Sequence, residues 1–69
     1  MEGISIEDQI ACVEREIRMR ENTYPRWVAQ NQLTQKTATL ELDRMKAVLA
    51  TLGYVKSERH ARATGVRLG

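Results

Sequence analysis

The chain of 69 residues contains few of the residue types that form disulfides, metal sites or an aromatic core. It has no phenylalanine and only one cysteine, one proline, one tryptophan and one histidine. The single cysteine, Cys12, excludes an intrachain disulfide, and its distance in sequence from His60 leaves no pattern of zinc ligands. Small proteins that lack both disulfides and a bound metal are commonly stabilised by a second chain. The composition therefore favours an oligomer.

Long apolar runs are also missing. The longest, AVLATL at residues 47–52, is far shorter than the roughly 20 residues that a membrane-spanning helix needs. The first ten residues, MEGISIEDQI, are acidic and lack the basic start of a secretory signal peptide. We therefore expect a soluble protein of a reducing compartment, the cytoplasm, that does not bind membranes.

No motif of catalysis stands out. The sequence has no glycine-rich phosphate loop and no nucleophile with a base at a suitable spacing. Neighbouring carboxylates such as Glu14 and Glu16 face different sides of a helix because they are two residues apart. We predict no catalytic residue, no metal site and no cofactor, and hence a protein that acts by binding another macromolecule.

Two amphipathic helices are present instead. Apolar side chains recur at the 4-3-4 spacing of a heptad seam in two segments, which predicts two helices. We expect helices over about 5–30 and about 34–55, a turn at 31–33, an N-terminal extension at 1–4 and a basic mobile tail at 57–69. The hairpin thus spans residues 5–56. The side chains predicted to form the core and the dimer contact are Ile10, Val13, Ile17, Leu42, Met45, Leu49 and Leu52.

Local signals set the ends of these helices. The hydroxyl of Ser5 can accept a hydrogen bond from the amide of Asp8, and Thr34 can start the second helix in the same way. Asn31 can adopt the left-handed conformation that ends a helix. Pro25 falls inside the first helix, where it predicts a bend; a clean break followed by a short extra helix is the alternative.

The apolar stripes predict how the helices assemble. Two helices joined by so short a turn run antiparallel. On the second helix, Val48 and Val55 widen the stripe beyond what one neighbouring helix covers. We therefore predict an all-α fold, an antiparallel two-helix hairpin that dimerises into a four-helix bundle.

The segment YPRWV at 24–28 is the strongest candidate for a partner-binding site. Tyrosine, tryptophan and arginine dominate the binding energy of protein interfaces. The residues predicted to bind a partner are Arg20, Tyr24, Arg26 and Trp27. Tyr24 and Trp27 can alternatively fill the end of the bundle core, and Arg20 can pack along the seam while its guanidinium reaches Glu16 or an acid of a partner chain.

Charge is spread unevenly along the chain. Residues 1–31 carry six acids and four bases, whereas residues 32–69 carry seven bases and three acids. The basic C-terminal part supports an alternative function, a small nucleic-acid-associated regulator, but it lacks interleaved aromatics and any groove-reading motif. We do not expect nucleic acid as the main partner. A structural coiled-coil module of a larger assembly is a third possibility.

The runs IEDQIACVEREIRMR, YPRWVAQNQLTQKTA and ELDRMKAVLATL carry a family resemblance. Over about residues 4–52 the chain resembles the quorum-sensing anti-activator proteins, small proteins encoded by temperate phages of pseudomonads. The resemblance implies a homodimer of helical hairpins that takes part in host takeover. Relatives are expected to have a glycine near the turn, where this chain has Asn31 and Gln32.

The resemblance also implies partners. They are a host transcription activator of the LuxR type, which responds to acyl-homoserine lactone, and the type IV pilus assembly ATPase. Inhibition is then expected to be stoichiometric, by covering a working surface of the host protein. This agrees with the residue pattern in kind, because both indicate contact surfaces and not catalysis.

Overall fold

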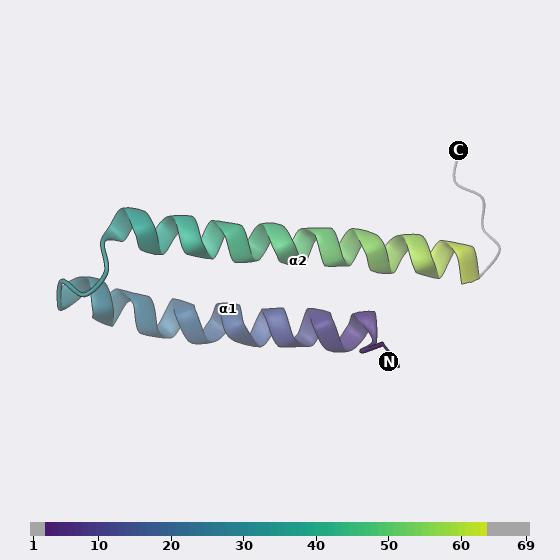
Figure 1. Ribbon diagram of the computed structural model, residues 1–69, viewed down its shortest axis with the longest axis horizontal. Coiled ribbons are helices and arrows are strands. Elements are labelled where there is room, and N and C mark those ends of the chain that lie inside the picture. The colour runs from purple at the N-terminus through teal and green to yellow at the C-terminus, as the bar shows by residue number, and fades with distance from the viewer. Residues whose placement is uncertain (1–2, 64–69) are drawn as a thin grey trace.

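Two long helices account for nearly all of the part of the chain that can be described. The computed structural model describes residues 3–63. Within this range α1 spans Ile6–Ala29 and α2 spans Gln35–Ala63, with no strand between or around them. The helices lie side by side and antiparallel, joined by a short turn (Figure 1). The predicted all-helical two-helix hairpin is confirmed.

The start of α1 follows the capping signal in the sequence. The Ser5 hydroxyl accepts a hydrogen bond from the Asp8 amide at 3.0 Å. Glu7 and Asp8 lie in the first turn, where their charges interact favourably with the positive end of the helix dipole. The first helix therefore begins where the sequence predicts.

α1 continues through Pro25. The helix is unbroken from Ile6 to Ala29 although Pro25 has no amide hydrogen to donate. The alternative of a clean break is therefore wrong. Pro25 stands close to the end of α1, so few hydrogen bonds remain beyond it, and the turn that follows is held by bonds of its own.

The turn closes with a Schellman motif centred on Asn31. Its φ of 61° is the left-handed conformation predicted for it. The Gln32 amide donates to the Trp27 carbonyl at 2.9 Å and the Asn31 amide donates to the Val28 carbonyl at 3.1 Å. The Thr34 hydroxyl then accepts from the Thr37 amide at 3.1 Å and caps α2. Asparagine thus serves where the resemblance leads one to expect glycine.

The end of α2 differs from the prediction. The helix continues to Ala63 and not to about 55, so residues 57–63 of the predicted mobile tail are helical. The segment lacks an apolar period, but it contains alanine, arginine and glutamate, which favour a helix without any packing partner. His60 and Arg62 also interact favourably with the negative end of the helix dipole. Residues 64–69 of the predicted tail lie outside the described residues.

The core between the helices is thin. Only Ile6, Ile17 and Ala38 are buried, and no described side chain is fully enclosed. Of the predicted core, Ile17 is buried and the remaining members are half-buried, namely Ile10, Val13, Leu42, Met45, Leu49 and Leu52. The molecule measures 52 × 30 × 18 Å. It is therefore a single layer of two helices, whereas stable domains usually bury their core between two layers.

Candidate protein-binding face

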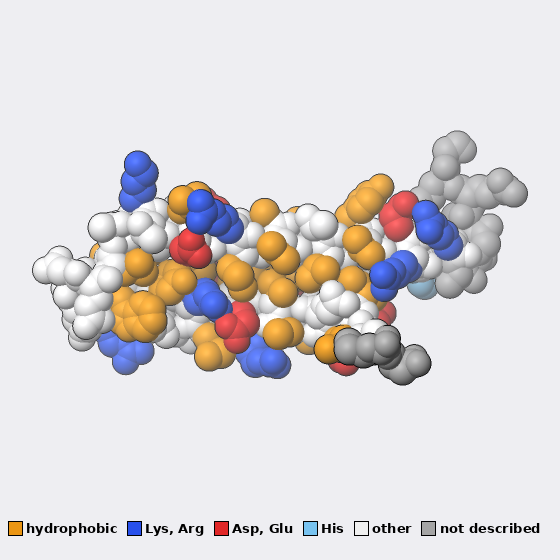
Figure 2. Space-filling model, in the orientation of Figure 1, with side chains coloured by type: hydrophobic (Ala, Val, Ile, Leu, Met, Phe, Trp, Pro, Cys, Tyr) orange, Lys and Arg blue, Asp and Glu red, His pale blue; other side chains and the backbone are white. Residues whose placement is uncertain are grey.

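One side of the hairpin carries exposed apolar side chains. Trp27 and Val48 are 43% and 48% exposed. Figure 2 shows hydrophobic side chains gathered in a band along the line between the two helices on this side. The spacing of about 100° per residue places a set of apolar residues here, and we call this set the apolar face. Its members are Val13 and Trp27 of α1 and Met45, Val48, Leu52 and Val55 of α2.

The two helices contribute to the apolar face for a geometric reason. In an antiparallel pair of right-handed helices, positions rotated in the same sense from the contact line lie on the same side of the pair. Trp27 and Val48 are rotated in the same sense from their seams, so they share a side. Leu40 and Tyr54 are also exposed, but they lie on the outer side of α2 and do not belong to the apolar face.

A hollow of about 370 Å³ lies on the apolar face toward the turn. All of its lining comes from α1, namely Glu16, Met19, Arg20, Thr23, Tyr24 and Trp27. The rings of Tyr24 and Trp27 pack against each other with centroids 5.9 Å apart and planes tilted by 33°. The structure thus brings together three of the four residues predicted to bind a partner.

Arg20 forms a salt bridge with Glu16 within the apolar face. Its Nη1 donates to Glu16 Oε1 and also to the Glu16 backbone carbonyl at 3.3 Å. The hydrogen bond from Arg20 to Glu16 raises the pKa of Arg20, because it stabilises the positively charged form. Each side chain remains about one-third exposed, at 35% and 37%. Of the two orientations that the sequence leaves open, the guanidinium reaches Glu16 of its own helix.

Arg26, the fourth predicted binding residue, lies apart from the hollow. It stands in the last turn of α1 and is exposed. Its side chain makes no ion pair or hydrogen bond to any residue in the range 3–63. The guanidinium is therefore available to an acidic partner without first losing an internal contact.

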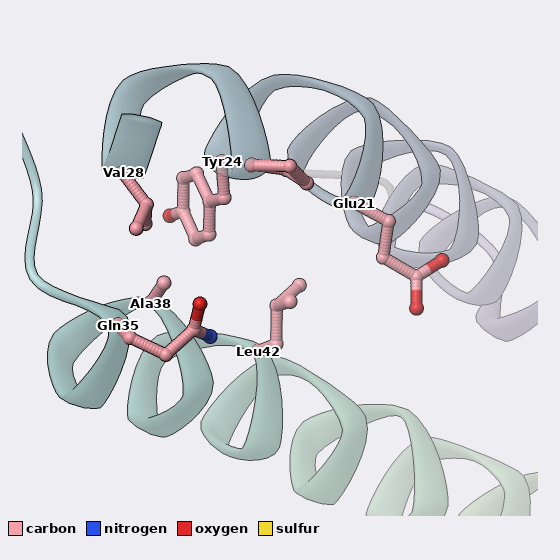
Figure 3. Close-up of a pocket in the computed structure, with 7 residues that line it drawn as sticks. Glu21, Tyr24, Val28, Gln35, Ala38 and Leu42 are labelled. Atoms are coloured by element: carbon pink, nitrogen blue, oxygen red, sulfur yellow. The ribbon is translucent and has the colours of Figure 1, made fainter. Parts of the chain in front are cut away.

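The opposite side of the hairpin, which we call the rear face, is charged. Lys46 of α2 pairs with Glu21 of α1 at 3.3 Å, and this is the one ion pair between the helices within residues 3–63. A smaller cavity of about 190 Å³ lies near it toward the turn (Figure 3). Both helices line this cavity, with Glu21, Tyr24, Pro25, Val28, Gln35, Ala38 and Leu42. The small side chain of Ala38 leaves this space where the two helices face each other.

A third hollow lies at the open end of the hairpin. Its volume is about 400 Å³, and its lining residues are Ser5, Ile6, Glu7, Lys56, Arg59 and His60. Arg59 and His60 come from the part of α2 that was predicted to be a mobile tail, and Lys56 is the last residue of the predicted hairpin. Glu7 and the neighbouring Asp8 offset part of their charge. The structure therefore places several basic residues near the C-terminal end of α2, next to acidic residues in the first turn of α1.

Cys12 is exposed in the single chain. No group of three or more histidine, cysteine or acidic side chains within residues 3–63 is arranged to hold a metal ion. Neither of the two described helices is long and apolar enough to cross a membrane.

Comparison with known proteins gives no further guide. No protein-family model, no curated protein and no solved structure matches the chain.

Proposed function

We propose that this chain is a non-catalytic binding protein that dimerises into a four-helix bundle and inhibits a host regulatory protein by covering one of its surfaces. The observation that carries the proposal is the apolar face, which the hairpin leaves exposed. Binding, and not chemistry, is the activity that such a surface supports.

The exposed area supports dimerisation. Within residues 3–62 only Ile6, Ile17 and Ala38 are buried, so most apolar side chains of the single hairpin stay in contact with water. A second hairpin laid on the apolar face supplies the missing layer and shelters Val48.

The end of the hairpin near the turn supports partner binding. Tyr24 and Trp27 form a stacked aromatic pair there, and Arg26 beside them has no internal partner among the described residues. Aromatic side chains together with an unpaired arginine match the composition of energetic hot spots at protein interfaces. An amphipathic helix or a helix end with acidic residues is the partner element that fits this surface.

The family resemblance supplies the identity of the partner. It supports a LuxR-type transcription activator as the main target and the type IV pilus assembly ATPase as a second one. In this proposal the hairpin dimer occupies the activator surface and prevents its action stoichiometrically. The segment YPRWV, which lies at the turn end, is also one of the runs that carry the resemblance.

The experiment uses the full chain and a purified LuxR-type activator loaded with acyl-homoserine lactone. We expect one equivalent of the protein to abolish DNA binding by the activator in a mobility-shift assay. The Arg26→Ala variant should retain its helicity and weaken the inhibition by about tenfold or more, the scale of an interface hot spot. The matched control is Arg18→Ala, an exposed arginine in the middle of α1. Undiminished DNA binding at tenfold excess would disprove this partner.

Nucleic acid remains a second candidate because of one observation. Lys56, Arg59 and Arg62 are exposed on an ordered helix, where they can follow a phosphate backbone. Binding of duplex DNA to the full chain at two salt concentrations tests this candidate. Affinity that falls steeply with salt and is lost in a Lys56→Ala, Arg59→Ala double variant would support it, and the absence of such binding would exclude it.

A further inference from the structure

A second row of residues on α1 has the spacing of a coiled-coil seam. It lies beside the contact with α2, on the side of the apolar face. The row repeats at intervals of 4-3-4-3-4 and contains Gln9, Val13, Glu16, Arg20, Thr23 and Trp27. Four of these six residues line the 370 Å³ hollow. The contact within the hairpin runs mainly through the neighbouring positions of Ile17 and Tyr24, and Val13 is the one residue of this row that also belongs to the predicted core.

This row is symmetric about the middle of α1. The sequence of intervals is the same in both directions, and its centre lies at the position of Arg18. The midpoint of the helix Ile6–Ala29 falls between Ile17 and Arg18. Row and helix therefore share one centre. Consider a two-fold axis that passes beside α1 at this level, perpendicular to the helix. It would place each row residue of one copy opposite the row residue of the second copy that lies equally far from the centre on the other side.

The innermost pair of the row is Glu16 and Arg20, which carry opposite charges. Under this symmetry Arg20 of one copy stands opposite Glu16 of the other. Both hydrogen bonds from Arg20 to Glu16 leave from Nη1, and a guanidinium has five N–H donors, so donors remain for a second carboxylate. If a second molecule covers the face, these groups lose water and need such partners. The arrangement is thus self-complementary.

The same axis brings together apolar groups on α2. Glu21 pairs with Lys46, so in the antiparallel hairpin the level of Arg18 corresponds to about Leu49. Val48, which is 48% exposed, lies next to that level on the apolar face. It would therefore meet Val48 of the second copy, and this contact would remove two exposed valines from water together.

We propose that two copies pair through their apolar faces with α1 antiparallel to α1, and that Arg20 of each copy bonds Glu16 of the other across the two-fold axis. This inference rests on the dimerisation proposed above and specifies its register. The charged quartet sets the register because a shift of the helices would bury each Glu16–Arg20 pair without its contacts to the second copy. The two turns then lie at opposite ends of the bundle, where Arg26 of each copy stays accessible.

The test separates the charges onto two chains. In the Glu16→Arg variant both inner positions are arginine, and in Arg20→Glu both are glutamate. Each variant alone should dimerise at least about tenfold more weakly, because like charges meet at the axis. A mixture of equal amounts should form heterodimers above the half expected from random pairing. Sedimentation velocity gives the affinities, and native mass spectrometry of the mixture gives the composition.

Two control chains complete the experiment. The double swap Glu16→Arg with Arg20→Glu restores complementarity and should return dimerisation to within about threefold of the original, even if a single variant folds poorly. Arg18→Glu changes a charge at the same level on the other side of the helix, and should also stay within about threefold. If Arg18→Glu dimerises normally, the weakening in the single variants depends on where the changed charge lies and not on the change of charge alone.

The outcomes distinguish this inference from the dimer itself. Preferential heterodimers together with recovery in the double swap support the antiparallel α1 pairing. Dimeric original protein with random mixing of the two variants overturns the pairing and leaves dimerisation standing. An original chain that remains monomeric at tens of micromolar overturns dimerisation, and the pairing with it.

Discussion

The apolar face and the rear face of the hairpin differ in the side chains that they expose to solvent. On the rear face, Lys46 and Glu21 link the helices and charged side chains meet the solvent. On the apolar face, Trp27 and Val48 meet the solvent and the charged pair of Arg20 and Glu16 lies within α1. On the rear face, the single chain leaves charged side chains in water. On the apolar face, it leaves apolar side chains in water until another molecule covers them.

This difference shows how function can be assigned to so small a molecule. An exposed apolar side chain by itself is ordinary, but a contiguous row on one side only is not. Among residues 3–62 the two helices alone bury only three side chains. We therefore propose that a second copy on the apolar face supplies the burial that the single hairpin lacks.

The largest effect on stability is expected in the core between the two helices. Ile17→Ala removes a side chain that is 7% exposed and leaves a cavity between the helices. The free energy of unfolding should fall by about 3 kcal/mol. Thermal and urea unfolding at fixed protein concentration measure the loss. An unchanged unfolding curve would contradict the placement of the core between α1 and α2.

A charge on the apolar face should have the next largest effect. Val48→Glu should weaken self-association by at least about tenfold, or about 1.4 kcal/mol, because the carboxylate would be buried against the second copy. The matched control is Ala50→Glu, which adds the same charge to the same helix at an exposed position away from the apolar face. Equilibrium sedimentation compares the two variants. Equal dissociation constants would mean that the apolar face does not form the interface.

The rear face should respond least. Lys46→Ala removes the ion pair with Glu21, whose side chains are 53% and 45% exposed. Exposed pairs of this kind contribute about 0.5 kcal/mol or less, and salt screens them. Urea unfolding at low and high salt should show a small difference that disappears at high salt. A loss comparable to that of Ile17→Ala would invalidate the contrast between the two faces.

The pattern of the sequence predicted the elements well because their ends are set by nearby residues. Ser5, Asn31 and Thr34 each act on groups within a few positions along the chain, so their bonds follow from sequence alone. The end of α2 was placed too early for the opposite reason. The prediction relied on the apolar period, which stops near Val55, whereas helix propensity carries the helix on to Ala63.

The candidate site was predicted in part. Arg20, Tyr24 and Trp27 were identified from residue type and position, and the structure places them around one hollow. Glu16 was identified only as one possible acceptor for Arg20. The signal that could have raised its importance was present, since Glu16 and Arg20 belong to a second 4-3 row beside the main seam. That row is weak in hydrophobicity, and an apolar pattern search passes over it.

The sequence by itself determined two helices, their caps and the side of each that meets the other, because these depend on hydrogen bonds and spacing within a few turns. Only the tertiary structure decided that Trp27 of α1 and Val48 of α2 fall on the same side of the hairpin, and that Arg20 turns to Glu16 of its own helix. Those features depend on how each helix is rotated about its axis against its neighbour. Packing sets that rotation, and no local bond specifies it.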